Sequence, residues 1–169
     1  DVYGRSKLIG EDLVQRFAAE TGTPTTSLRL FNVFGTRETN PHLVPAIVEQ
    51  LERDGAEIEL GNLTPKRDFV HVTDVARAVE EAVDAVDDGY SVYNVGSGTA
   101  YSVREVVEAT GAALGTRISV EQDGDRVRES DRPHHQASID RISDELGWEP
   151  EVSLEEGLAE LLAARDVQP

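Results

Sequence analysis

The chain has 169 residues with neither Cys nor Met, and its 33 Asp and Glu residues outnumber 16 Lys and Arg residues, for a net charge of −17. Without Cys, a disulfide framework and a thiolate metal site are excluded. The negative charge disfavours nucleic acid and anionic membranes as partners, and no apolar run of about 18 residues predicts a membrane span.

The charged residues also indicate the salt concentration in which the protein works. The acidic residues are spread along the chain, and Lys7 and Lys66 are the only lysines. This pattern favours a halophilic source over an ordinary acidic protein, because dispersed carboxylates keep a protein soluble in concentrated salt. No basic and apolar leader opens the chain, so a cytoplasmic location is expected.

Periodic apolar residues predict an α/β fold. Spacings of three and four residues predict helices at 4–21, 43–54, 74–87, 103–115, 140–146 and 154–165. Runs rich in β-branched and aromatic residues predict strands at 26–31, 57–60, 68–72, 91–95 and 117–121. Helices and strands alternate along the chain, as in α/β proteins.

A glycine-rich phosphate turn is missing from this pattern. The chain contains no G-x-G-x-x-G, and Gly96-Ser97-Gly98 lacks the third glycine and lies well before the next predicted helix. This segment is therefore predicted to be a loop and not a dinucleotide site. His134 and His135 are adjacent and point apart on an extended strand, so no metal site is expected there.

Tyr3 and Lys7 form the first candidate for chemistry. At positions i and i+4 of a helix they share one face. An ammonium beside a phenol favours the phenolate, and a phenol of that kind can exchange a proton with a sugar hydroxyl or carbonyl. Such spacing also occurs by chance in many helices, so the surrounding motifs decide.

Five segments in order resemble the extended short-chain dehydrogenase/reductases, the family of nucleotide-sugar epimerases and dehydratases such as UDP-glucose 4-epimerase. They are Y-G-R-S-K at 3–7, R-L-F-N-V-F-G at 29–35, G-N-L-T-P-K-R-D-F-V-H-V-T-D-V at 61–75, Y-N-V-G-S-G at 93–98, and R-E-S-D with L-G-W-E-P at 128–150. The resemblance covers nearly the whole chain, and five motifs in the right order rarely arise by chance.

The resemblance implies the C-terminal part of a Rossmann-type doubly wound fold plus a small α/β substrate-binding domain. Residues 1–40 would end the NAD-binding domain, with the catalytic helix and the following strand. Residues 41–169 would mainly form the substrate-binding domain, with a return to the Rossmann sheet near 68–97. In this family the glycine-rich loop precedes the Tyr–Lys helix, so the chain is expected to be a C-terminal half that is inactive alone.

The same resemblance assigns roles to residues. Tyr3 would be the general acid and base, Lys7 would hold the nicotinamide ribose, and Phe31 would lie beside NAD. The substrate-binding residues would be Asn32, Leu43, Leu60, Arg67, Arg128 and Asp131.

Elementary chemistry supports several of these assignments. A guanidinium matches a diphosphate bidentately, which suits Arg67 and Arg128, and helix amides after His42 suit phosphate oxygens. Several epimerases carry Asn where this chain has His42. Structural roles are expected for four further residues, which are Asp68, His71, Asp74 and Trp148.

The predicted function is NAD-dependent epimerisation of a nucleotide sugar at C4, through a keto-sugar. The resemblance favours a UDP-sugar as substrate and a homodimer as the full-length enzyme. A nucleotide-sugar 4,6-dehydratase is the alternative, because the G-N-L-x-P-x-R-D loop is a form found in several dehydratases. A non-catalytic nucleotide-sugar binding module and an acidic interaction domain without a ligand also stay open.

Overall fold

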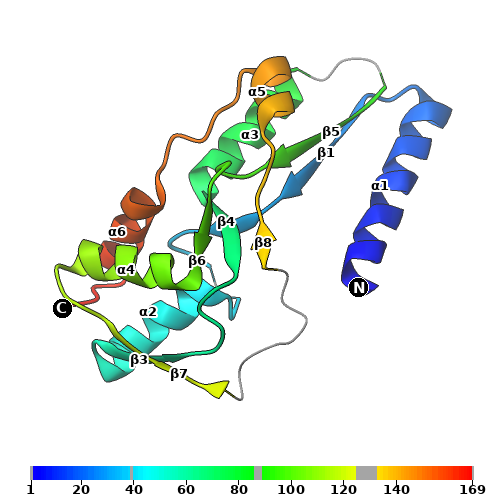
Figure 1. The fold of residues 1–169 in the computed structure, drawn as a ribbon. Helices are drawn as coiled ribbons and strands as arrows, with labels where there is room; N and C mark the ends of the chain where they lie inside the picture. Colours follow the sequence, from blue (N-terminus) through cyan, green and yellow to red (C-terminus); the bar gives the residue numbers. More distant parts are fainter. Residues whose placement is uncertain (1, 39, 86–88, 125–132, 169) are drawn as a thin grey trace.

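The computed structural model describes residues 2–38, 40–85, 89–124 and 133–168. Within these ranges, helices and strands alternate along the chain (Figure 1). In chain order they are α1 (Val2–Thr21), β1 (Thr25–Leu30), β2 (Asn32–Phe34), α2 (Leu43–Asp54), β3 (Glu57–Leu60), β4 (Lys66–His71), α3 (Val72–Asp84), β5 (Tyr90–Val95), β6 (Ala100–Ser102), α4 (Val103–Leu114), β7 (Ser119–Gln122), β8 (His134–His135), α5 (Asp140–Leu146) and α6 (Leu154–Ala164).

The α/β prediction is confirmed, and each predicted helix and strand has a counterpart. The strands β2, β6 and β8 were missed, because runs of two or three residues carry no readable period. Two helices begin at capping boxes. Ser102 and Ser153 each accept a hydrogen bond from the third helical amide, and the Glu at that position bonds back.

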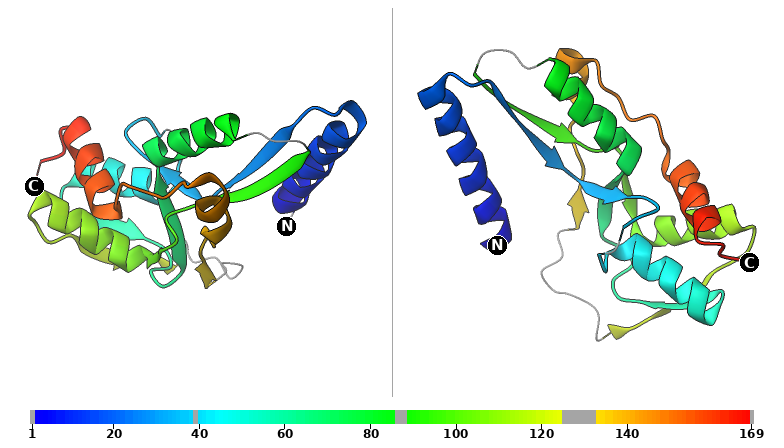
Figure 2. Two further views of the ribbon diagram at one scale, coloured as in Figure 1. Left: turned by 90° about the horizontal axis from the view of Figure 1, so that it is seen from above. Right: turned by 180° about the vertical axis from the view of Figure 1, so that it is seen from behind.

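Beside α1, strands β1 and β5 form a parallel pair, with Thr25 opposite Tyr90 and Leu30 opposite Val95. Arg29 of β1 donates two hydrogen bonds to the carboxylate of Glu11, at 2.8 and 2.6 Å, and so ties α1 to the strand. The views in Figure 2 show α1 at one end of the molecule, beside this pair. The predicted domain boundary near residue 40 stays a prediction.

Strand β4 is the centre of the fold. It pairs in parallel with β2 and β8 and antiparallel with β6, while β3 and β7 form a separate parallel pair. The larger apolar core lies among α2, α4, α6 and the β3–β7 pair, and a smaller one joins β4 and β5 to α3 and α5.

Two buried carboxylates connect these parts. Asp68 of β4 accepts hydrogen bonds from the amides of Ser97, Gly98 and Ala137 at 2.6 to 3.0 Å. The Gly96-Ser97-Gly98 segment is thus a loop as predicted, and two of its amides are bound to Asp68 rather than free for a phosphate.

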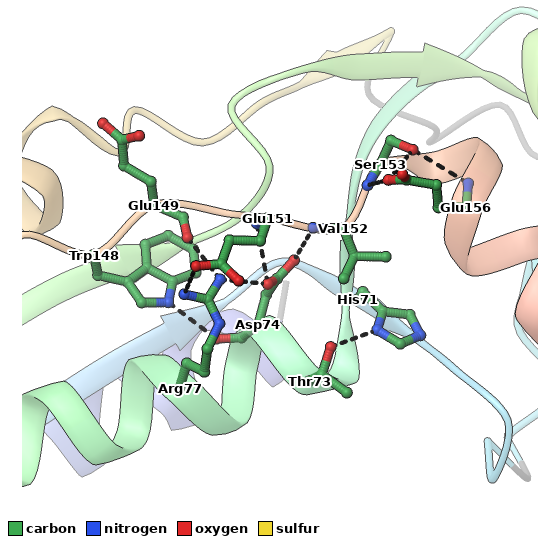
Figure 3. Close-up of polar contacts among 10 residues, drawn as sticks. All are labelled: His71, Thr73, Asp74, Arg77, Trp148, Glu149, Glu151, Val152, Ser153 and Glu156. Carbon is green, nitrogen blue, oxygen red and sulfur yellow. Dashed lines mark hydrogen bonds and ion pairs between the residues drawn. The ribbon is translucent and has the colours of Figure 1, made fainter.

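Asp74 connects α3 to the segment before α6. Its carboxylate accepts from Arg77 and from the amides of Glu151 and Val152, and Nε1 of the buried Trp148 donates to its backbone carbonyl at 3.0 Å (Figure 3). The structural roles predicted for Asp68, Asp74 and Trp148 are therefore confirmed by their contacts.

Candidate active site

Tyr3 and Lys7 lie together on α1. The ammonium nitrogen of Lys7 is 5.2 Å from the centroid of the Tyr3 ring, a cation–π arrangement. The Tyr3 residue is 70% exposed, so its phenol is open to a ligand. The helix therefore presents the tyrosine and the cation on one face, as their spacing predicts.

The face of Tyr3 borders a cavity of about 980 Å³. Residues of α1, β1, β2 and the loop that leads to α2 line it, together with one residue each of α3 and β8. The lining residues are Tyr3, Leu30, Phe31, Asn32, Val33, Phe34, Gly35, Thr36, Arg37, Glu38, Asn40, His42, Val72 and His135. This volume is in the range of small-molecule sites.

A second cavity of about 280 Å³ adjoins the first. The two share five lining residues, which are Asn32, Val33, Phe34, Glu38 and His42. The smaller cavity adds Leu43 at the start of α2 and Arg67 of β4. Together the two cavities are lined by the predicted residues Tyr3, Phe31, Asn32, Leu43 and Arg67.

Asn32 and Arg67 also make protein contacts beside these cavities. Nδ2 of Asn32 donates to the carbonyl of Asp68 at 2.8 Å, which ties β2 to β4. Nη1 of Arg67 donates to the carbonyl of Lys66 at 2.9 Å. These bonds fix the direction of both side chains at the cavity wall, as preorganised binding groups require.

The other predicted substrate residues are one that lies away from both cavities and two that the structure does not describe. Leu60 is buried in the larger apolar core and is not among the lining residues of either cavity. Arg128 and Asp131 lie outside the described residues, so their roles stay predictions.

The structure adds cavity residues that the sequence reasoning missed. The ring of His135 stacks on Phe31, with centroids 4.8 Å apart and an interplanar angle of 24°. Nδ1 of His42 lies 2.6 Å from Oε1 of Glu38. Glu38 and His42 stand four residues apart, but they precede α2 in a loop, so their spacing gave no signal for that pair. His135 has no local signal, because the pairing of β8 with β4 places it there.

Burial and hydrogen bonding act in opposite directions on Glu38. Burial raises the pKa of this carboxyl group, and the hydrogen bond with His42 partly opposes that effect.

Within the described part of the chain, no group of three metal-ligating side chains occurs, and no helix has the length and apolarity to cross a bilayer.

Comparison with known proteins identifies the family to which the chain belongs. A model of the family described as GDP-mannose 4,6 dehydratase matches residues 1–161. The chain belongs to this family of nucleotide-sugar epimerases and dehydratases, as its motifs predict.

Two curated relatives show which enzymes the chain is similar to. The chain is 33% identical over 166 residues to a dTDP-L-rhamnose 4-epimerase of Burkholderia thailandensis, covering 95% of the chain and 45% of the relative. It is 32% identical over 166 residues to a UDP-glucose 4-epimerase of Corynebacterium glutamicum, covering 89% of the chain and 50% of the relative. The chain thus spans about half the length of the curated relatives it matches.

Solved structures agree with the fold. UDP-glucose 4-epimerase of Bifidobacterium longum, in complex with NAD+ and UDP, superposes with a TM-score of 0.85 at 27% identity, over 97% of this chain and 54% of that one. RMD of Pseudomonas aeruginosa, complexed with NADPH, has a TM-score of 0.87 at 26% identity, over 96% and 55%. The fold is therefore that of enzymes that bind nicotinamide dinucleotides.

Proposed function

We propose that this chain carries the catalytic tyrosine and the sugar-nucleotide site of an NAD-dependent nucleotide-sugar 4-epimerase, with a UDP-sugar as substrate. The observation that carries the proposal is the pair of cavities with shared walls, of which the larger is lined by Tyr3 and Phe31 and the smaller by Arg67 and Leu43. A nucleotide sugar has matching ends, a sugar that reacts and an anionic diphosphate that an Arg and helix amides hold.

The larger cavity fits the nicotinamide end of NAD. Phe31 and the half-exposed Leu30 offer an apolar wall. Tyr3, with Lys7 beside its ring, can hold the ribose hydroxyls. Bound there, NAD would supply the acceptor and donor of hydride for a sugar carbon. Because the sequence has no G-x-G-x-x-G turn, these residues would hold only this end of NAD.

The chain's own residues then have separate tasks. The Tyr3 phenol moves the proton of the sugar hydroxyl as the carbonyl forms and reverts. Arg67 and the amides at the start of α2 hold the diphosphate, and Asn32, whose Oδ1 makes no hydrogen bond to the described residues, can accept one from the substrate. Four further assignments complete the proposed site, with the backbone of Leu60 beside the base and Arg128 and Asp131 at the nucleotide, while Lys7 orients the ribose.

A 4,6-dehydratase is a second candidate. The family description names a dehydratase, and the loop before Arg67 has the form found in several of them. Product analysis separates the two reactions, because a dehydratase releases a 4-keto-6-deoxy sugar while an epimerase returns a sugar of unchanged mass.

The activity test joins this chain to the part of the Corynebacterium glutamicum epimerase that it does not cover. We expect NAD-linked turnover of UDP-glucose, and we expect Tyr3→Phe to lower kcat at least about 100-fold, because the proton-transfer group is lost. Tyr90→Phe is the matched control, since Tyr90 bonds Ser27 away from both cavities. A Tyr3→Phe protein with the parent rate would contradict the assignment.

Calorimetry with the chain alone tests the non-catalytic alternative. A binding module takes UDP-glucose tightly without NAD, whereas half of an enzyme binds either molecule weakly.

We propose further that the enzyme is cytoplasmic, comes from a salt-rich cell and dimerises through α1. The exposed apolar stripe of Ile9, Leu13 and Phe17 supports dimerisation through this helix.

A further inference from the structure

The Glu38–His42 pair occupies a special place in the site. Both residues line both cavities, so they lie where the two spaces meet. His42 is the N-cap residue of α2, with extended backbone angles of φ −86° and ψ 178°, yet its side chain makes no capping hydrogen bond. Its ring is instead directed to Glu38, with Nδ1 2.6 Å from Oε1.

The two partners differ in exposure. The Glu38 side chain is 12% exposed and the His42 side chain 66%. A carboxylate can only accept a hydrogen bond, so Nδ1 of His42 carries the proton that they share. The second ring nitrogen, Nε2, makes no hydrogen bond within the described residues and is open to a ligand.

We propose that Glu38 and His42 form a proton-linked anion contact, which makes binding of the nucleotide-sugar diphosphate pH-dependent. This inference rests on the proposed function. With one proton, on Nδ1, the pair has a charge of −1 and Nε2 presents a lone pair to the phosphate. A second proton, on Nε2, makes the pair neutral and turns Nε2 into a charge-assisted donor. Lower pH therefore strengthens binding.

Other ionisable groups face the same space. Tyr3, Arg37 and His135 line the larger cavity, and Arg67 lines the smaller one. Among these four groups His135 alone is a histidine, the side-chain type whose charge ordinarily changes near neutral pH. His135 is thus the competing source of a pH effect between pH 5.5 and 8.5.

The binding test follows UDP-glucose by NMR with the intact 169-residue chain, because the diphosphate of this sugar ester keeps its charge over that range. We expect the affinity to fall about 5- to 10-fold from pH 6 to pH 8, the loss of one charge-assisted bond. His42→Asn should abolish the dependence. The matched control is His134→Asn, a histidine that bonds Gln136 outside both cavities and should keep it.

Glu38→Gln has an expected effect on binding that a structurally perturbed site would not show. Removing a negative charge beside the phosphate should tighten binding at pH 8 about 3- to 10-fold and change it little at pH 6. Weaker binding of this variant at both pH values would overturn the proposal. So would a pH dependence that survives His42→Asn and disappears in His135→Asn.

A ligand-free measurement keeps the inference separate from the proposed function. Imidazole ¹⁵N shifts at pH 8.5 should show the Nδ1–H tautomer for His42 and the Nε2–H tautomer in Glu38→Ala. An Nε2–H ring in the parent chain would refute the pair itself. If the tautomers are as expected but UDP-glucose binds at no pH, the proposed function fails, and the ligand role of the pair fails with it.

Discussion

Phe34 shows how single residues position the site. It lines both cavities, and its ring lies edge-on to buried His71 with centroids 5.3 Å apart. Gly157 of α6 lies close to both rings. Nδ1 of His71 lies 2.8 Å from the hydroxyl of Thr73 (Figure 3), while its buried Nε2 has no hydrogen-bond partner among the described residues.

Gly157→Ala tests this packing. A Cβ at position 157 would lie 2.6 Å from Cζ of Phe34, so we expect a loss of about 1–3 kcal/mol of unfolding free energy through overpacking. Gly10→Ala is the matched control in α1, where no atom lies within 4 Å of the added Cβ, and it should gain about 0.5–1 kcal/mol. Urea unfolding measures both, and two gains would contradict the packing argument.

At the scale of elements, α4 depends on its first turn. Ser102 Oγ accepts from the amide of Glu105 at 3.1 Å, and Glu105 accepts from the amide of Ser102 at 2.6 Å. These bonds, chiefly the one from the Ser102 amide, lower the pKa of Glu105 to about 2, with a smaller effect from Lys66. Helix α4 packs on α6 in the larger core, so the cap also supports that core.

The pH dependence of this cap has a definite sign. Because the pKa of Glu105 is lower in the folded chain than its ordinary value of 4.5, its stabilisation is complete above pH 4.5 and is lost as the pH falls towards about 2. We expect Glu105→Gln to be less stable at pH 7 and to lose less stability between pH 5 and pH 3. Urea unfolding at several pH values tests this, and equal slopes for both proteins would contradict it.

At the scale of the whole molecule, charge repulsion opposes the fold. A net charge of −17 on 169 residues makes the compact state repel itself, and added ions screen that repulsion. The salt-adapted source proposed above would use this balance.

Potassium chloride should therefore stabilise the chain. We expect the thermal midpoint to rise steadily between about 0.1 and 2 M KCl, most steeply at the low end where screening changes fastest. Differential scanning calorimetry measures the midpoint. A midpoint that stays constant or falls over this range would count against the charge argument.

The fold could be predicted well where local patterns decide. The helices follow from apolar spacing, and the capping boxes at Ser102 and Ser153 mark two starts within a few residues. The strands β6 and β8 could not be predicted. They hold three and two residues, and their partners on β4 lie more than 30 residues away in the chain.

The candidate site divides in the same way. The sequence by itself determined the α/β class and the place of Tyr3 and Lys7 on one helical face, because a helical turn brings residues four apart together. Only the tertiary structure decided that His135 stacks on Phe31 and that Glu38 bonds His42 at the junction of the two cavities. These contacts depend on strand pairing and on the path of a loop, which local periodicity does not encode.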